Sequence, residues 1–227
     1  MRAFQIKVDG KTLDYRLGEK LDLDEVKAFF KKKYQVVKLW SAGRHVVDYL
    51  SAIIDFAEEI ATLPAVARND DDTGMTSHKQ HFLEKTKLWF EDIPLIIREK
   101  YQIIDLLNLV KSSYQKLEKR PRHGDFTPWH LMLLRNGKLG LIDGEHALEN
   151  GVENYDLGYF IQRVYSVLKN PVLAKKILEL LIKRGYKMEK LKTILASRAI
   201  GGFLDEALKP KPNYQMAASF KEFVKSL

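Results

Sequence analysis

The segment between residues 122 and 146 constrains the fold more than any other part of the sequence. Two short apolar runs, LMLL and LGLI, flank Asn136-Gly137, a dipeptide that favours a tight turn between antiparallel strands. A turn containing Asp125 precedes the first run, and Asp143 follows the second. Because a hairpin brings its outer ends together, we expect the carboxylates of Asp125 and Asp143 to converge although 18 residues separate them.

Most of the remaining sequence has a helical pattern, so we predict an α+β protein that is mostly helical. Apolar residues recur at intervals of three and four in three segments before the hairpin, and again after it. The predicted helices cover residues 44–62, 79–91 and 95–119 and much of the chain from Tyr155, with breaks at Pro171, at Gly185, around Gly201-Gly202 and at 209–212.

The first 40 residues have a different pattern, with little helix. FQIKV and KTLDYRL flank Asp9-Gly10, which predicts another hairpin. Asp22 or Asp24 can cap a helix that runs through about Lys33, and the following YQVVKLW is compatible with a strand or with a helical extension. Further along, residues 65–78 have no apolar period and are predicted to form an exposed loop, whose acids Asp70–Asp72 could attract a metal ion or simply be solvated.

The composition excludes several classes of protein. The chain of 227 residues has no cysteine, which excludes a thiol nucleophile or a Cys-based zinc site and agrees with a reducing compartment. It also has no apolar run long enough to span a membrane and no apolar signal core, so we expect a cytoplasmic protein without a membrane span.

The net charge of +8 arises from 38 basic and 30 acidic residues and raises the question of nucleic acid as a partner. Two basic clusters, Lys31–Lys33 and a group from Lys116 to Arg122, fall at predicted helix ends, where cations complement the helix dipole. No RNA-binding signature accompanies them. A nucleic-acid partner is therefore not expected, although an RNA-associated role remains a third hypothesis.

Two converging carboxylates suit phosphoryl transfer. One can orient an attacking hydroxyl and accept its proton, while the other holds Mg²⁺ against the phosphates of a nucleotide. The competing interpretation of Asp125 and Asp143 is that both are turn-favouring acids beside glycines, which are common in any protein.

The sequence HGDFTPW at 123–129, with LGLIDGEHAL and Asn154-Tyr155-Asp156-Leu157-Gly158 downstream, resembles the aminoglycoside phosphotransferase and choline kinase family. The resemblance implies a protein-kinase-like fold that uses ATP and Mg²⁺ to phosphorylate a hydroxyl of a small-molecule or glycan-like acceptor. Residues 1–40 would form a reduced N-terminal lobe or hinge segment. Residues 41–227 would form the helical lobe, with a catalytic loop at 122–130 and a metal loop at 142–146.

The resemblance also implies roles for individual residues. Asp125 would be the catalytic base and Asp143 the principal metal ligand. His123 would brace the catalytic loop, and Asp156 would be a buried acid that holds the loop from below. Glu145 could join the metal shell or be a solvent-facing acid.

The sequence departs from the family pattern in two places. His130 occupies the position of a metal-binding Asn, and its imidazole suits Mn²⁺ or zinc better than Mg²⁺. The short front end has no glycine-rich phosphate loop; Lys7 and Lys38 are candidates for a nucleotide-binding lysine, with ordinary exposed strand lysines as the alternative. These departures motivate the competing hypothesis of a catalytically weakened pseudokinase or binding module.

The sequence does not identify the acceptor. The loop acids Asp70–Asp72, with Glu84 or Glu91, could favour a cationic molecule. Acids of this kind are common on any protein surface, so no acceptor class follows from them.

Overall fold

A computed structural model describes residues 5–8, 11–14, 37–38, 49–62, 77–133, 139–141 and 143–227. Within these residues the protein has the predicted α+β class and is mostly helical. The helices are α3 (Leu50–Thr62), α4 (His78–Asp92), α5 (Leu95–Lys100), α6 (Ile104–Ser113), the 3₁₀ turn η1 (Tyr114–Lys116), α7 (Tyr155–Ser166), α8 (Pro171–Lys183), α9 (Met188–Ala207) and α10 (Gln215–Ser226). The strands are β1 (Gln5–Val8), β2 (Lys11–Asp14), β3 (Val37–Lys38), β4 (Lys119–Arg122), β5 (Leu131–Leu133), β6 (Leu139–Leu141) and β7 (Leu148–Val152).

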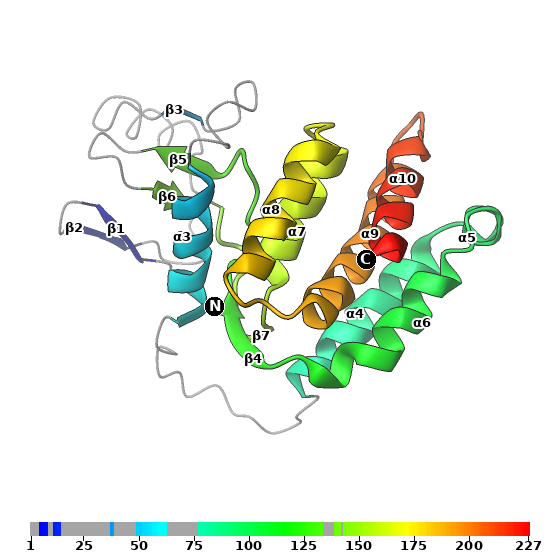
Figure 1. The fold of residues 1–227 in the computed structure, drawn as a ribbon, viewed down its shortest axis with the longest axis horizontal. Helices are drawn as coiled ribbons and strands as arrows, with labels where there is room; N and C mark the ends of the chain where they lie inside the picture. Colours follow the sequence, from blue (N-terminus) through cyan, green and yellow to red (C-terminus); the bar gives the residue numbers. More distant parts are fainter. Residues whose placement is uncertain are drawn as a thin grey trace.

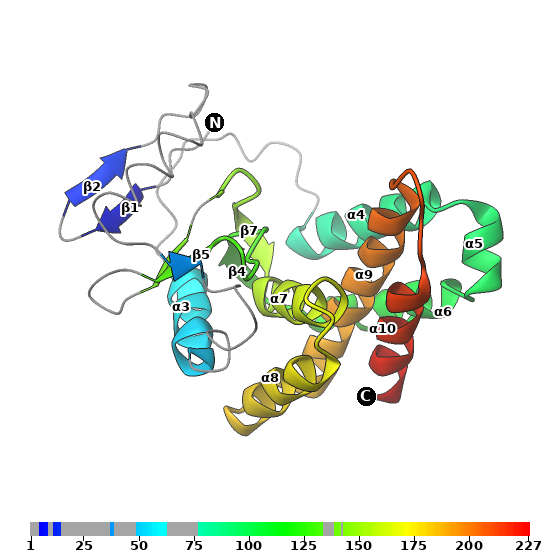
Figure 2. The ribbon, with the colours of Figure 1, turned by 90° about the horizontal axis from the view of Figure 1, so that it is seen from above.

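Helix α9 is the centre of the helical core. It contacts α4, α6, α7 and α10, and its residues from Lys190 to Phe203 are buried almost without interruption. A helix that is buried all round has no solvent side, so its neighbours must cover every face. Figure 1 shows α9 enclosed in this way, and Figure 2 shows α4, α5 and α6 on the far side of α9 from α3 and the β5–β6 pair.

The strands form three small antiparallel sheets. Strands β1 and β2 pair with each other, β5 pairs with both β6 and β3, and β4 pairs with β7. The β5–β6 pair confirms the hairpin predicted on either side of Asn136-Gly137, and the β1–β2 pair confirms the one on either side of Asp9-Gly10. The β4–β7 pair was not predicted, and it places the start of the predicted catalytic loop beside the chain that enters α7.

The prediction of one helix over 95–119 is wrong. Helix α5 ends at Lys100, because Gln102 takes the left-handed conformation (φ 47°) and the backbone N–H groups of Gln102 and Ile103 bond back to the carbonyls of Glu99 and Arg98. This is a Schellman cap, and the fully buried Ile103 supplies its hydrophobic contact.

Two further predictions are corrected by packing and by proline. Gly201 and Gly202 do not interrupt α9; a Cβ at Gly202 would lie only 3.2 Å from the Gln162 side chain, so glycine serves close packing there. The basic residues from Lys119 to Arg122 do not end a helix, because Pro121 cannot donate to a helical ladder and the segment pairs with β7 instead. The predicted breaks at Pro171, Gly185 and 209–212 are confirmed.

Some predictions fall outside the described residues. They include the helix from Asp22 or Asp24 to Lys33, residues 44–48 at the start of the predicted 44–62 helix, the loop acids Asp70–Asp72 and both hairpin turns. The strand alternative for part of YQVVKLW is confirmed at Val37–Lys38.

Helices α7 and α9 approach each other most closely at Gly158. A methyl group at this position would lie 2.5 Å from Cγ2 of Ile194, so Gly158→Ala is expected to lower the free energy of unfolding by about 1–3 kcal/mol. Ile194→Leu removes the offending Cγ2 while keeping the side-chain volume. Urea unfolding of the single and double variants should therefore show that Ile194→Leu restores part of the loss, and strict additivity of the two changes would contradict this account of the contact.

Candidate functional site

The predicted catalytic loop follows β4 directly and is anchored by buried side chains. Phe126 is fully buried, and its ring lies 6.4 Å from Phe56 of α3 and 5.8 Å from Phe160 of α7. Thr127 is also fully buried, whereas the Asp125 side chain keeps 19% of its surface exposed. The loop is therefore anchored by Phe126 and Thr127, while the Asp125 carboxylate stays partly exposed.

Asp156, at the start of α7, fastens this loop to the helical core. Its two carboxylate oxygens accept hydrogen bonds from the backbone N–H groups of His123 (2.7 Å) and Gly124 (2.8 Å). Burial raises the pKa of Asp156 to about 6, while these two bonds and the positive charge of Arg122 oppose the rise. The carboxyl group is consequently ionised for the most part at neutral pH, where it is the stronger acceptor.

Gly124 brings the predicted catalytic loop against the predicted metal loop. It has φ +86°, and a Cβ there would lie 2.2 Å from the backbone carbonyl oxygen of His146. Only glycine fits both this conformation and this contact. Asp143 in the metal loop is also left-handed (φ 68°), a conformation that costs a non-glycine residue roughly 1 kcal/mol or more and that is common at functional sites.

Asp125, His130 and Asp143 meet where these two loops face each other. One potential ligand atom from each residue lies within 4.8 Å of the other two. Nδ1 of His130 is 3.3 Å from Oδ2 of Asp125, and Nε2 is 3.4 Å from Oδ2 of Asp143. The predicted convergence of the two acids is thus what the structure shows, and His130 stands between them.

The hydrogen bonding of His130 indicates what its second nitrogen can do. Nδ1 lies 3.0 Å from the backbone carbonyl oxygen of Asp125, which has no proton to give, so a neutral ring places its proton on Nδ1. Nε2 then presents a lone pair to the Asp143 carboxylate. Two lone-pair groups 3.4 Å apart require a cation between them, either a proton or a metal ion.

The donor set fits a divalent ion. Ligand bonds of about 2.1 Å put neighbouring ligand atoms about 3 Å apart on an octahedral ion, close to the 3.4 Å between Nε2 of His130 and Oδ2 of Asp143. Two carboxylates suit Mg²⁺ or Mn²⁺, and an imidazole nitrogen favours Mn²⁺ of the two. Asp143 and Nε2 of His130 would hold such an ion, with the Asp125 carboxylate nearby on the Nδ1 side of the ring.

The other predicted residues are placed as follows. His123 is buried, and burial lowers its pKa to about 4, so its imidazole is neutral at pH 7. Glu145 is 69% exposed and lies 3.5 Å from His146, outside the Asp–His–Asp group. Lys7 and Lys38 are in β1 and β3, but their side chains lie outside the described residues.

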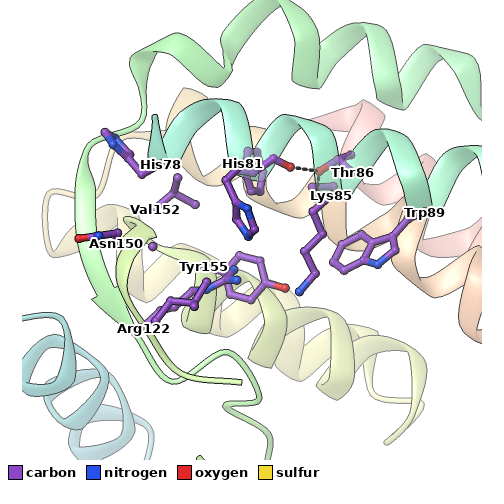
Figure 3. A pocket seen from close by; sticks show the side chains of 13 residues that line it. His78, His81, Lys85, Thr86, Trp89, Arg122, Asn150, Val152 and Tyr155 are labelled. Atoms are coloured by element: carbon purple, nitrogen blue, oxygen red, sulfur yellow. Dashed lines mark hydrogen bonds between the residues drawn. The ribbon is translucent and has the colours of Figure 1, made fainter. Parts of the chain in front are cut away.

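A pocket of about 190 Å³ opens beside the catalytic loop, and sequence reasoning missed it. We call it the cationic pocket. It reaches Gly124 and His146 of the two loops, and its helical wall carries three cations and one acid: Lys85 and Trp89 from α4, Tyr155, Tyr159 and Arg163 from α7, and Arg198 and Asp205 from α9. A narrow cleft that shares Lys85, Trp89 and Tyr155 continues from it toward Arg122; Figure 3 shows Lys85 extending toward Tyr155, with Trp89 beside it.

The sequence held a signal for this pocket. Lys85 and Trp89 are four residues apart, as are Tyr155 and Tyr159, so each pair lies on one helical face. Arg198 interrupts the most apolar stretch of α9, where a cation is unusual. The tertiary contact between the three helices was needed to bring these faces together.

No protein-family model matches the chain, and no curated protein is significantly similar to it in sequence. Of the helices in the described ranges, none combines the length and the apolar character that crossing a membrane requires.

The titration of Asp156 gives a pH-dependent test of how this carboxylate holds the backbone of His123 and Gly124. A raised native pKa means that folding favours the protonated form, so the stability that Asp156 contributes is greatest below about pH 4 and falls as the pH rises through 6. The stability difference between wild type and Asp156→Asn should therefore shrink, by up to about 3 kcal/mol, between pH 4 and pH 7. Urea unfolding at four pH values measures it. The exposed Asp92→Asn variant serves as the control, and a pH-independent difference for Asp156→Asn would count against a raised pKa.

Proposed function

We propose that this chain is an ATP-dependent phosphotransferase with a protein-kinase-like helical lobe, which transfers the terminal phosphoryl group of ATP to a hydroxyl of a small-molecule acceptor. The observation that carries the proposal is the convergence of Asp125 and Asp143 on His130 across two facing loops. The resemblance of HGDFTPW and LGLIDGEHAL to the aminoglycoside phosphotransferase and choline kinase family supports the same activity.

In the proposed reaction, Asp125 is the general base. Its partly exposed carboxylate orients the acceptor hydroxyl and takes its proton as the hydroxyl oxygen bonds to the terminal phosphorus of ATP. The bond from that phosphorus to the bridging oxygen breaks, and ADP leaves. A divalent ion held by Asp143 and His130 would neutralise charge on the phosphates.

The remaining residues hold this arrangement in place. Asp156 fixes the backbone at the start of the proposed catalytic loop, and Gly124 lets the proposed metal loop approach it. Lys7 and Lys38 stay predictions for contact with the nucleotide phosphates.

Hydrolysis of ATP without an acceptor, as slow transfer to water, provides the test. Wild type should show activity that depends on Mg²⁺ or Mn²⁺, and Asp125→Asn and Asp143→Asn should each reduce it by about 100-fold or more, because each removes a charged group from the reacting centre. Asp92→Asn at the exposed end of α4 is the matched control. Unchanged hydrolysis in both site variants would refute the proposal.

The second candidate function is a binding module of the same fold, and the position of His130 favours it. An imidazolium at this point would lie within 3.4 Å of both carboxylates and could replace the metal ion as their counter-charge. In such a protein the site would be structural, and the lobe would serve to bind a partner.

Metal titration separates the two candidates. In the phosphotransferase, wild type binds Mn²⁺ more tightly than Mg²⁺, and His130→Asn should shift this preference toward Mg²⁺ by about tenfold, because an amide oxygen is a harder ligand than imidazole. Calorimetry with each ion measures the preference, with Asp143→Asn as the variant that should lose both. Absence of binding of either ion to wild type would favour the binding module.

A further inference from the structure

Three cations surround Tyr155 without a carboxylate to pair with. Within the described residues, Lys85, Arg122 and Arg198 form no ion pair with an Asp or Glu. Arg198 is 4% exposed and Arg122 is 6% exposed, so neither charge is well solvated. Burial of an unpaired charge is costly, which makes this arrangement unusual in a folded protein.

The other buried cations of the helical lobe are paired. Lys190, also almost fully buried, contacts Glu118 at 2.7 Å and Glu153 at 2.6 Å. Arg163 lines the same cationic pocket, and its guanidinium donates to Asp205 at 2.7 Å. The unpaired state is therefore a property of one location and not of buried cations in this fold.

Aromatic rings compensate the three charges only in part. The Arg122 guanidinium lies 3.8 Å from the centre of the Tyr155 ring, and that of Arg198 lies 3.9 Å from the Tyr159 ring. The Nε atoms of both arginines are buried without a hydrogen-bond partner. One guanidinium nitrogen of Arg198 also donates to the Tyr155 hydroxyl at 3.2 Å. A ring face offsets a cation by a few kcal/mol at most and leaves the remaining N–H donors free for an anion.

The electrostatic effect on neighbouring groups agrees with an uncompensated positive potential. Burial lowers the pKa of the Lys85 ammonium, and the charges of Arg122 and Arg198 lower it further. Burial alone would raise the pKa of the Tyr155 hydroxyl, but Arg198, Arg122 and Lys85 outweigh this and lower it. Deprotonated or anionic groups are thus favoured here.

We propose that the acceptor of this enzyme is a phosphate-bearing hydroxyl compound, whose phosphate binds in the cationic pocket between Lys85, Arg198 and the neighbouring Arg122. This inference rests on the proposed function and names its substrate class. A phosphate dianion with several acceptor oxygens matches three cations with free donors better than a single carboxylate does. The pocket reaches Gly124, the residue before Asp125, so the proposed acceptor would extend from the phosphate toward Asp125 with its hydroxyl.

Calorimetry with inorganic phosphate, at constant ionic strength and without nucleotide or metal, tests the pocket. Wild type should bind phosphate, and Lys85→Met and Arg198→Met should each weaken binding by about 10-fold or more, as expected for the loss of a charge-assisted hydrogen bond. Acetate should bind more weakly than phosphate. Acetate binding as tight as phosphate binding, no phosphate binding by wild type, or unchanged affinity in both variants would overturn the proposal.

Lys190→Met is the matched control, since it also removes a buried cation, but one that is paired. It should lower the unfolding temperature and leave phosphate affinity unchanged. Arg198→Met should instead keep or raise the unfolding temperature without phosphate, because it removes an unpaired buried charge. A large loss of stability in Arg198→Met would mean that the guanidinium is a structural element and would contradict a ligand-binding role.

Failure of the proposed phosphate site can be distinguished from failure of the proposed phosphotransferase activity. Asp125→Asn should reduce ATP hydrolysis by about 100-fold or more and retain phosphate binding, whereas the loss of phosphate binding in Arg198→Met is measured without nucleotide and does not depend on hydrolysis. Phosphate binding without hydrolysis in wild type would reject the phosphotransferase and keep the anion site, and hydrolysis without phosphate binding would reject the anion site alone.

Discussion

The site depends on one buried carboxylate. Asp156 stands at the start of α7 and holds the backbone N–H groups of two consecutive residues, one on each of its oxygens. Those N–H groups have no strand partner, because the chain has just left β4 for the catalytic loop. Without an acceptor they would be buried donors, each costing about 1–3 kcal/mol. The backbone position of Asp125, the next residue along the chain, therefore depends on bonds made by a residue outside the Asp–His–Asp group.

The loop that contains Asp125 and the cationic pocket carry unbalanced charges of opposite sign. Around Asp125, two acids face each other and need a cation; around Tyr155, three cations face one another and need an anion. The two sets are neighbours, since the pocket reaches Gly124 and His146. Each set is unfavourable alone in a medium of low dielectric constant, and a metal ion on one side with a phosphate on the other would satisfy both.

The sequence allowed the helical character, both hairpins and the convergence of Asp125 with Asp143 to be predicted, because turn chemistry and apolar period are local signals. The β4–β7 pair could not be predicted from the sequence, because Pro121 and a run of charged residues are not typical of a strand. This segment becomes a strand through its pairing with β7. The break at Gln102 was missed because glutamine rarely takes the left-handed conformation. The cationic pocket was missed because its members come from three helices that meet only in the fold.

Strand β5 has β6 on one edge and β3, from the first forty residues, on the other. The front segment therefore does more than precede the helical lobe: it covers a row of backbone groups that would otherwise be open to pairing with another molecule. Open strand edges template association between chains. Loss of this segment would accordingly turn the free edge of β5, in the hairpin that leads to Asp143, into a surface for self-association.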